Sequence, residues 1–153
     1  MKPLINCTIT ETKSKICREE EGKKICFEHI KYEIVGDVVS IDKCVFNKVH
    51  GERKCDYLFL FDKKRQQYNF LKNKISPAYY VELKGIDLVS ACEQLLNSII
   101  KTKDQISEFE INALVVSSKE FHPKYHNNEY YRDLKRLIKK NIQFLITPHT
   151  VNL

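Results

Sequence analysis

The order of apolar and polar residues predicts strands first and helices later. Residues 4–35 alternate, and "KICREEEGKKICFEHIKYEIVG" predicts two extended segments around a polar turn at Glu21-Gly22. "DVVSIDKCVF" is rich in β-branched residues and predicts a strand at about 37–46. "CDYLFLF", 55–61, is apolar almost throughout, as is typical of a central strand covered on both faces. A polar, basic connection follows and ends at Pro77, so that the next strand is expected at 78–85.

The apolar period then changes. In "IDLVSACEQLLNSIIK" apolar residues recur at helical spacing, and Asp87 stands where an N-terminal cap is expected. "INALVVSS" predicts a buried strand, "NEYYRDLKRLIKKN" an amphipathic helix, and "IQFLIT" a last strand. This order predicts one α/β domain over 1–153, with its core at about 37–147: a mixed central β-sheet flanked by helices, plus an N-terminal β-hairpin extension. The strand–helix–strand unit at 79–117 should be a right-handed crossover between parallel strands.

Two charged residues interrupt the apolar strand at 78–85, where burial is costly unless they have a function. Because side chains alternate along a strand, Tyr80, Glu82 and Lys84 share one face. Asp56 opens the preceding apolar strand, so pairing of the two strands would bring Asp56 close to Glu82. Two carboxylates at the end of a sheet suit Mg²⁺, and a lysine beside them can hold or polarise a water. Such a site can hydrolyse a phosphodiester.

These segments, "CDYLFLF" and "YYVELKGIDLVSACEQL", resemble the PD-(D/E)xK nuclease superfamily, which has the restriction-endonuclease-like fold. Asp56, Glu82 and Lys84 match its Asp and Glu-x-Lys positions, and the similar region spans roughly 38–117. The resemblance implies a restriction-endonuclease-like core and metal ligation by Asp56, Glu82 and the Leu83 backbone carbonyl. It also implies that Lys84 positions the attacking water, and that Gln94 lies near the active site.

The chain departs from the superfamily pattern at Cys55, where the motif's name has Pro, and in its N-terminal region, where many relatives have a helix. Asp42, in the strand before Asp56, is a further candidate metal ligand or else a solvent-facing residue. Other interpretations stay open for the remaining residues. Glu82 and Lys84 could form an ordinary ion pair, and Gln94 could be a solvated helix residue.

The net charge of +6, from 26 Lys and Arg against 20 Asp and Glu, agrees with an anionic partner such as nucleic acid. One basic group lies in the connection between the two paired strands, where we expect it near one rim of the site, in contact with phosphate: Lys63, Lys64, Arg65, Lys72 and Lys74. A second group lies on the helix expected at 128–141 and is either a solvated face or a further contact. Its candidates for binding nucleic acid are Arg136 and Lys140.

The six cysteines include no CxxC pair, so a zinc site is not expected. We expect mostly buried, reduced thiols, with disulfides as the alternative. The chain has no apolar run of membrane-spanning length, and its N-terminus lacks the apolar core of a signal peptide. The expectation is a cytoplasmic protein without a membrane partner.

Together these features predict a Mg²⁺-dependent nuclease, with Mn²⁺ as a substitute metal, that acts on DNA in restriction, repair or junction processing. Two alternatives remain. One is a catalytically silent nucleic-acid-binding or protein-interaction module on the same fold. The other is a small subunit of a larger nuclease complex, and a homodimer is also compatible with the sequence. The sequence does not distinguish DNA from RNA, or endonuclease from exonuclease action.

Overall fold

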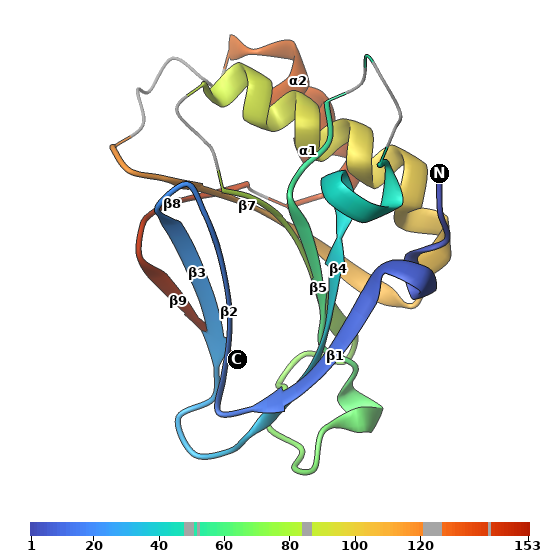
Figure 1. Cartoon of the computed structure of the whole chain (residues 1–153), viewed down its shortest axis with the longest axis vertical. Coiled ribbons are helices and arrows are strands. Elements are labelled where there is room, and N and C mark those ends of the chain that lie inside the picture. The colour runs from blue at the N-terminus through green and yellow to red at the C-terminus, as the bar shows by residue number, and fades with distance from the viewer. Residues whose placement is uncertain (48–50, 52, 84–86, 121–126, 141) are drawn as a thin grey trace.

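The computed structural model describes residues 1–47, 51, 53–83, 87–120, 127–140 and 142–153. Within these residues the fold is mixed α/β, as predicted, with a six-stranded sheet, a three-stranded sheet and two α-helices (Figure 1). No helix in this described part is both long enough and apolar enough to cross a bilayer. The cytoplasmic location stays a prediction.

The large sheet has the strand order β1-β4-β5-β6-β7-β8. Neighbouring strands pair antiparallel from β1 through β4 and β5 to β6. The pairs β6–β7 and β7–β8 are parallel. The expected parallel pairing across the first helix is therefore confirmed. The strand bounds are β1 Thr8–Lys13, β4 Ile34–Ser40, β5 Tyr57–Leu60, β6 Ser76–Glu82, β7 Phe109–Ser117 and β8 Gln143–Ile146.

The small sheet confirms the N-terminal hairpin and adds a strand that was not expected. Strands β2 (Lys15–Glu20) and β3 (Lys23–Glu28) pair antiparallel, and β9 (His149–Asn152) pairs parallel with β3. The turn residues Glu21 and Gly22 have φ of 47° and 78°. Both values are left-handed, as a two-residue hairpin turn of type I′ requires. The N-terminal and C-terminal regions thus share one sheet.

Helices cover one face of the large sheet, and the small sheet covers the other (Figure 1). Helix α1 (Leu88–Thr102) packs on the large sheet and on α2 (Glu129–Ile138), burying Leu95 and Leu134 beside Tyr80. Between the two sheets lies a second apolar cluster that includes Phe27 and Phe59. The prediction of flanking helices is therefore correct for one face only, because the hairpin and β9 occupy the other.

The strand expected at 37–46 lies earlier in the sequence, at Ile34–Ser40. Strand β4 ends at Ser40, and the chain then forms a helical turn, η2 (Ile41–Val45), in which the Phe46 N–H donates to the Ile41 carbonyl at 3.0 Å. Three shorter helical turns are η1 (Leu4–Cys7), η3 (Lys63–Arg65) and η4 (Lys103–Ile106). The apolar residues Ile41, Val45 and Phe46 extend the pattern past Ser40, which is why the sequence predicts a longer strand.

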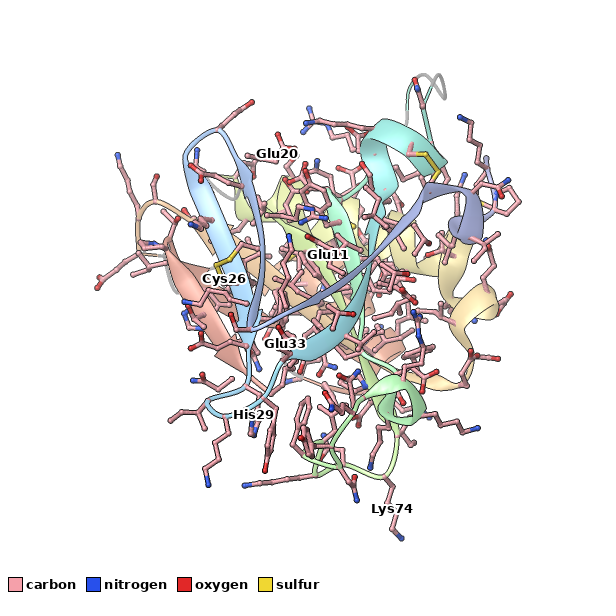
Figure 2. All side chains as sticks on the ribbon, turned by 60° about the horizontal axis from the view of Figure 1, so that its bottom comes forward. Glu11, Glu20, Cys26, His29, Glu33 and Lys74 are labelled. Carbon is pink, nitrogen blue, oxygen red and sulfur yellow. A yellow bond between two sulfur atoms is a disulfide. The ribbon has the colours of Figure 1, made fainter. Side chains whose placement is uncertain are left out.

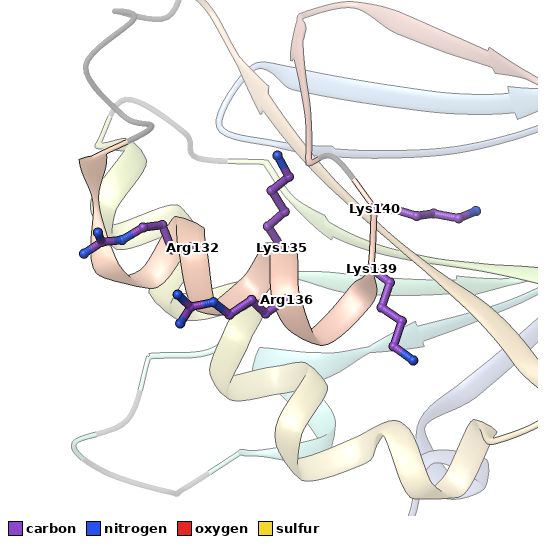
Figure 3. A pocket seen from close by; sticks show the side chains of 5 residues that line it. All are labelled: Arg132, Lys135, Arg136, Lys139 and Lys140. Carbon is purple, nitrogen blue, oxygen red and sulfur yellow. The ribbon is translucent and has the colours of Figure 1, made fainter.

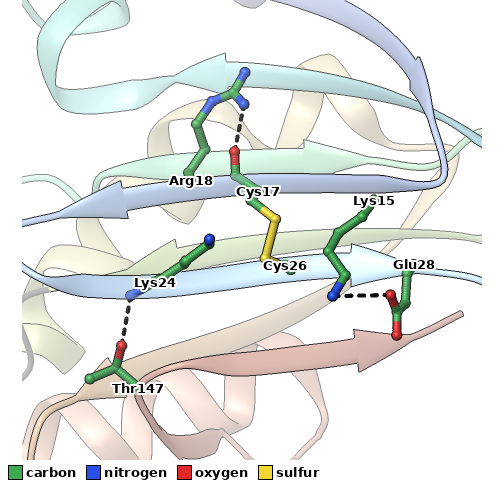
Figure 4. The surroundings of a disulfide bond; sticks show 7 residues. All are labelled: Lys15, Cys17, Arg18, Lys24, Cys26, Glu28 and Thr147. Carbon is green, nitrogen blue, oxygen red and sulfur yellow. Dashed lines mark hydrogen bonds and ion pairs between the residues drawn. A yellow bond between two sulfur atoms is a disulfide. The ribbon is translucent and has the colours of Figure 1, made fainter.

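Four cysteines form disulfides, so the prediction of reduced thiols is wrong for them. Cys7 is bonded to Cys44, which joins η1 to η2. Cys17 is bonded to Cys26, its direct partner in the hairpin register (Figure 4). Cys55 and Cys92 are buried free thiols, as expected. Hairpin register, which spacing in the sequence does not give, brings the second pair together.

Candidate functional site

Asp56 and Glu82 stand opposite each other at one end of the large sheet. Tyr57 on β5 is the register partner of Val81 on β6, and the next residues outward are Asp56 and Glu82. Directly opposite residues of an antiparallel pair project to the same face, with Cβ atoms about 4.5–5.5 Å apart. That face is the one that carries Leu58 and Tyr80 and is covered by α1. The juxtaposition expected from alternation is therefore present.

Both carboxylates are buried: Asp56 is 6% exposed and Glu82 is 1% exposed. The Leu83 backbone N–H donates to Asp56 Oδ2 at 2.8 Å, and the Ile41 N–H donates to the Asp56 carbonyl oxygen at 3.0 Å. These two bonds tie Asp56 to the end of β6 and to the start of η2. A carboxylate held in this way has little freedom to turn, which is the condition for a defined ligand position.

The Asp56 and Glu82 carboxylates also affect the pKa of Cys55, the residue directly before Asp56. Burial raises the pKa of the Cys55 thiol well above its ordinary value; the Ser98 hydroxyl opposes this rise, while Glu82 and Asp56 add to it. The Cys55 backbone N–H donates to Ser98 Oγ at 2.9 Å, which anchors this segment on α1. Because the thiolate is the reactive form, Cys55 is not suited to act as a nucleophile.

Gln94 reaches the site from the second turn of α1, although it touches the backbone rather than a carboxylate. Its Nε2 donates to the carbonyl oxygen of Lys54 at 3.2 Å. Asp87 is the N-terminal cap of α1 and directly precedes its first residue. Its side chain accepts the N–H groups of Val89 and Ser90 at 3.1 and 3.2 Å. The cap fixes where the helix starts, and thereby where Gln94 stands.

The sequence analysis does not identify Lys54, a lysine that is only 2% exposed. Its Nζ lies 4.9 Å from the centroid of the Phe46 ring, within the range of a cation–π contact. Lysine is almost never this buried unless it has partners. The signal that could have found it is its place two residues before Asp56 in "KCD", between the turn and the apolar strand.

Lys84 lies outside the described residues, so its direction stays a prediction, as does ligation by the Leu83 carbonyl. Asp42 is exposed on η2 rather than in a strand. Among the described residues no group of three or more His, Cys, Asp or Glu could hold a metal ion. Asp42 therefore does not join Asp56 and Glu82 as a third ligand, and the described residues supply two carboxylates to the site. Two carboxylates completed by waters are within the usual coordination of Mg²⁺.

The basic connection between β5 and β6 does not lie at this site, and the expectation that it does is wrong. The connection leaves β5 at Leu60 and enters β6 at Ser76, whereas Asp56 and Glu82 stand at the other ends of these strands. At 3.2–3.4 Å per residue, the length of β6 separates the two ends by roughly 20 Å.

Two of the predicted phosphate contacts in this connection have partners in the protein: one lies within the connection and the other on β4. Lys63 Nζ donates to the Asn73 carbonyl, and Arg65 forms an ion pair of 2.5 Å with Asp37. Lys64, Lys72 and Lys74 are exposed.

The second basic group forms a continuous surface on α2 and just after it. Its five residues line a depression of about 500 Å³ (Figure 3): Arg132, Lys135, Arg136, Lys139 and Lys140. Arg132 and Arg136 extend to the same side of the helix in Figure 3. Lys140 pairs with Glu110 at 2.7 Å and Arg136 with Asp133 at 3.4 Å. Since Glu110 lies near the start of β7, the surface ends far from Glu82.

The arrangement at Asp56 and Glu82 thus combines two buried carboxylates, a buried lysine and a helix capped beside them. Comparison of the chain with protein-family models, with curated proteins and with solved structures finds no match.

Proposed function

We propose that the chain is a Mg²⁺-dependent nuclease that hydrolyses phosphodiester bonds in DNA on a restriction-endonuclease-like core. The observation that carries the proposal is the pair of buried carboxylates, Asp56 and Glu82, at the same end and on the same face of adjacent strands. The hydrogen bond from Leu83 N–H to Asp56 fixes one of them. The order of three antiparallel strands, helix and parallel strand supports the core assignment.

In this proposal Asp56 and Glu82 hold the cation, and Lys84 orients the attacking water. A bound Mg²⁺ would polarise the phosphoryl oxygen and lower the pKa of the water. The water oxygen forms a bond to phosphorus, the bond from phosphorus to the leaving sugar oxygen breaks, the water proton passes to solvent, and the leaving oxygen takes up a proton from solvent to become a hydroxyl. Gln94 acts as a positioning residue, because it holds the Lys54 carbonyl two residues before Asp56. The cationic surface on α2 supplies phosphate contacts, of which Arg136 and Lys140 are two.

A catalytically silent module on the same fold is the second candidate. The observation in its favour is Lys54, a buried cation two residues before the buried Asp56. Such a group can serve the fold alone, since breaking a buried charge pair costs about 3–5 kcal/mol. A requirement for a partner subunit would also leave the isolated chain inactive.

The experiment compares Asp56→Asn and Glu82→Gln with Asp42→Asn, an exposed carboxylate on η2 that serves as the matched control. Supercoiled, linear, branched and single-stranded DNA are incubated with Mg²⁺, Mn²⁺ or EDTA. Metal catalysis supplies several kcal/mol, so each site variant should lose cleavage by roughly a thousandfold, about 4 kcal/mol of barrier. Asp42→Asn should cleave like the unchanged chain. An unchanged chain that neither cleaves any substrate nor shifts its melting temperature with Mg²⁺ would overturn the proposal.

A further inference from the structure

A stack of aromatic rings lies at the end of the sheet opposite to Glu82. It joins the loop between β3 and β4 to the connection between β5 and β6. The rings of His29 and Tyr32 lie 5.0 Å apart with planes 7° from parallel, and those of Tyr32 and Tyr68 lie 4.2 Å apart at 22°. Phe70 closes the group at 4.5 Å from His29. We call these four residues the ring stack.

The outer member of the ring stack, Tyr68, is exposed, whereas the other three rings of the stack are half-buried. Tyr68 is 48% exposed and Ile30, beside His29, is 90% exposed, whereas Phe27 and Phe59 are fully buried. Tyr68 stands at the end of the stack: in the described part of the chain, Tyr32 is the ring that it contacts. One face of the Tyr68 ring is therefore packed while much of the residue remains open to solvent. Burial of apolar surface in the core does not explain this placement.

Positive charge surrounds the ring stack. The segments 29–33 and 63–75 contain six cationic residues and one acid, Glu33, while Asp37 on β4 pairs with Arg65 and Asp62 caps η3. Figure 2 shows His29, Glu33 and Lys74 at the same end of the molecule. A depression of about 360 Å³ is lined by Leu71 and Lys72, which follow Phe70 in the chain, and also by Asn73, Tyr79 and Asn152. Rings, amides and lysines thus lie on one surface.

This combination distinguishes between classes of nucleic acid. A ring can stack only on a base whose face is free, and in a duplex the neighbouring base pairs already cover both faces. Aromatic side chains beside a positively charged groove are the features that bind single strands without sequence preference. A stable duplex would use the lysines alone and leave the rings without a role.

We propose that the ring stack binds unpaired bases of a single-stranded nucleic acid, with Tyr68 as the outer stacking platform and Lys64, Lys72 and Lys74 at the phosphates. The inference rests on the proposed function in that it names the class of substrate that the nuclease would cleave, although the ring stack is a separate surface from the carboxylates. The ring stack lies roughly 20 Å along β6 from Glu82. A substrate that reaches both would carry a single-stranded segment next to the phosphodiester that is cleaved.

The test measures binding without metal, so that it is independent of cleavage. Fluorescein-labelled oligothymidylate and oligouridylate, and a duplex of the same length, are titrated with the full chain in EDTA, and anisotropy is recorded. The single strands should bind more tightly than the duplex. Because one base–aromatic stack is lost, Tyr68→Ala should weaken single-strand binding by roughly 5- to 150-fold. Tyr68→Phe keeps the ring and should bind like the unchanged chain.

Ile100→Ala is the matched control, since Ile100 is 51% exposed on α1, away from the ring stack. Circular dichroism melts show whether each variant folds. The inference is overturned if folded Tyr68→Ala binds single strands as tightly as the unchanged chain, or if the duplex binds equally well. Preferential binding of a proline-rich peptide would also overturn it. Asp56→Asn should bind normally, and an unchanged chain that binds single strands through Tyr68 but cleaves no substrate would reject the nuclease proposal alone.

Discussion

At Asp56, the structure of the site depends on backbone groups from outside its own strand. The carboxylate accepts an N–H from Leu83, just after β6, and the main chain accepts one from η2. Alternation along the strand and pairing of two apolar runs were enough to predict that Asp56 meets Glu82. They could not predict Lys54, because a charged residue before a strand is usually exposed. The direction of the basic connection was also misjudged: in an antiparallel pair it leaves from the end of the strand opposite to Asp56.

The buried thiols give a prediction about pH. Burial raises the pKa of Cys55 well above its ordinary value, and it raises the pKa of Cys92 to about 12. An unfolded thiol ionises near pH 8.5, so from about pH 8.5 up to the folded-state pKa of about 12 at Cys92 the unfolded chain loses protons that the folded chain keeps. The free energy of unfolding should therefore fall as pH rises through this window. Urea melts measure it.

A Cys55→Ala, Cys92→Ala double variant provides the control for this pH dependence. It should show a flatter decline over the same window, although with lower stability throughout. In the unchanged chain, alkylation of the two thiols by iodoacetamide should be slow until the protein unfolds. An equally steep decline in the double variant would show that other groups cause the pH dependence.

At the scale of elements, the strongly periodic segments were predicted well and the short or distant ones were not. Helix α1 followed from its apolar spacing and from Asp87 as its cap, and the hairpin followed from its turn. Strand β9 has only four residues, and its partner β3 lies near the other end of the chain. No local pattern carries such a pairing, because the pairing is decided by packing against the large sheet.

Gly36 on β4 shows how closely the two sheets approach each other. A Cβ atom at this position would lie 2.8 Å from Ile16 Cδ1 and 2.8 Å from Phe61 Cε1, both of which belong to the core between the sheets. Gly36→Ala should therefore destabilise the fold by about 1–3 kcal/mol through overpacking. Thermal or urea melts test this expectation.

The matched control for Gly36 is Gly22, whose added Cβ would meet nothing within 4 Å. Its φ of 78° is left-handed, a conformation that asparagine tolerates better than most residues. Gly22→Asn should therefore change stability much less than Gly36→Ala. Equal effects of the two substitutions would mean that close packing of the sheets is not the cause.

At the scale of the whole molecule, the two disulfides constrain the N-terminal third of the chain. The Cys7–Cys44 bond spans 37 residues and the Cys17–Cys26 bond spans 9. In the chain-entropy account, a longer closed loop gives more stability, which predicts about 4 kcal/mol for the first bond and about 2.5 kcal/mol for the second. Paired substitution of Cys7 and Cys44 by alanine should therefore lower the melting temperature more than the same change at Cys17 and Cys26.

Treatment with a reductant gives an independent measurement on the unchanged chain. It should lower the melting temperature by about as much as removal of both bonds together. It should have no effect on a variant that already lacks all four bonded cysteines. A melting temperature that does not respond to the reductant would show that these bonds contribute nothing to stability.

The parallel pairing of β3 with β9 has a consequence for how the protein is made. Strand β3 leaves the ribosome early, whereas its parallel partner β9 is synthesised only after β8. Until residues 149–152 emerge, the small sheet lacks one of its strands. The apolar cluster of Phe27 and Phe59 then lacks part of its cover. Contacts between such distant segments form slowly, and apolar surface that waits for its cover is prone to aggregate. The nascent chain is therefore expected to depend on chaperones until its last strand has been added.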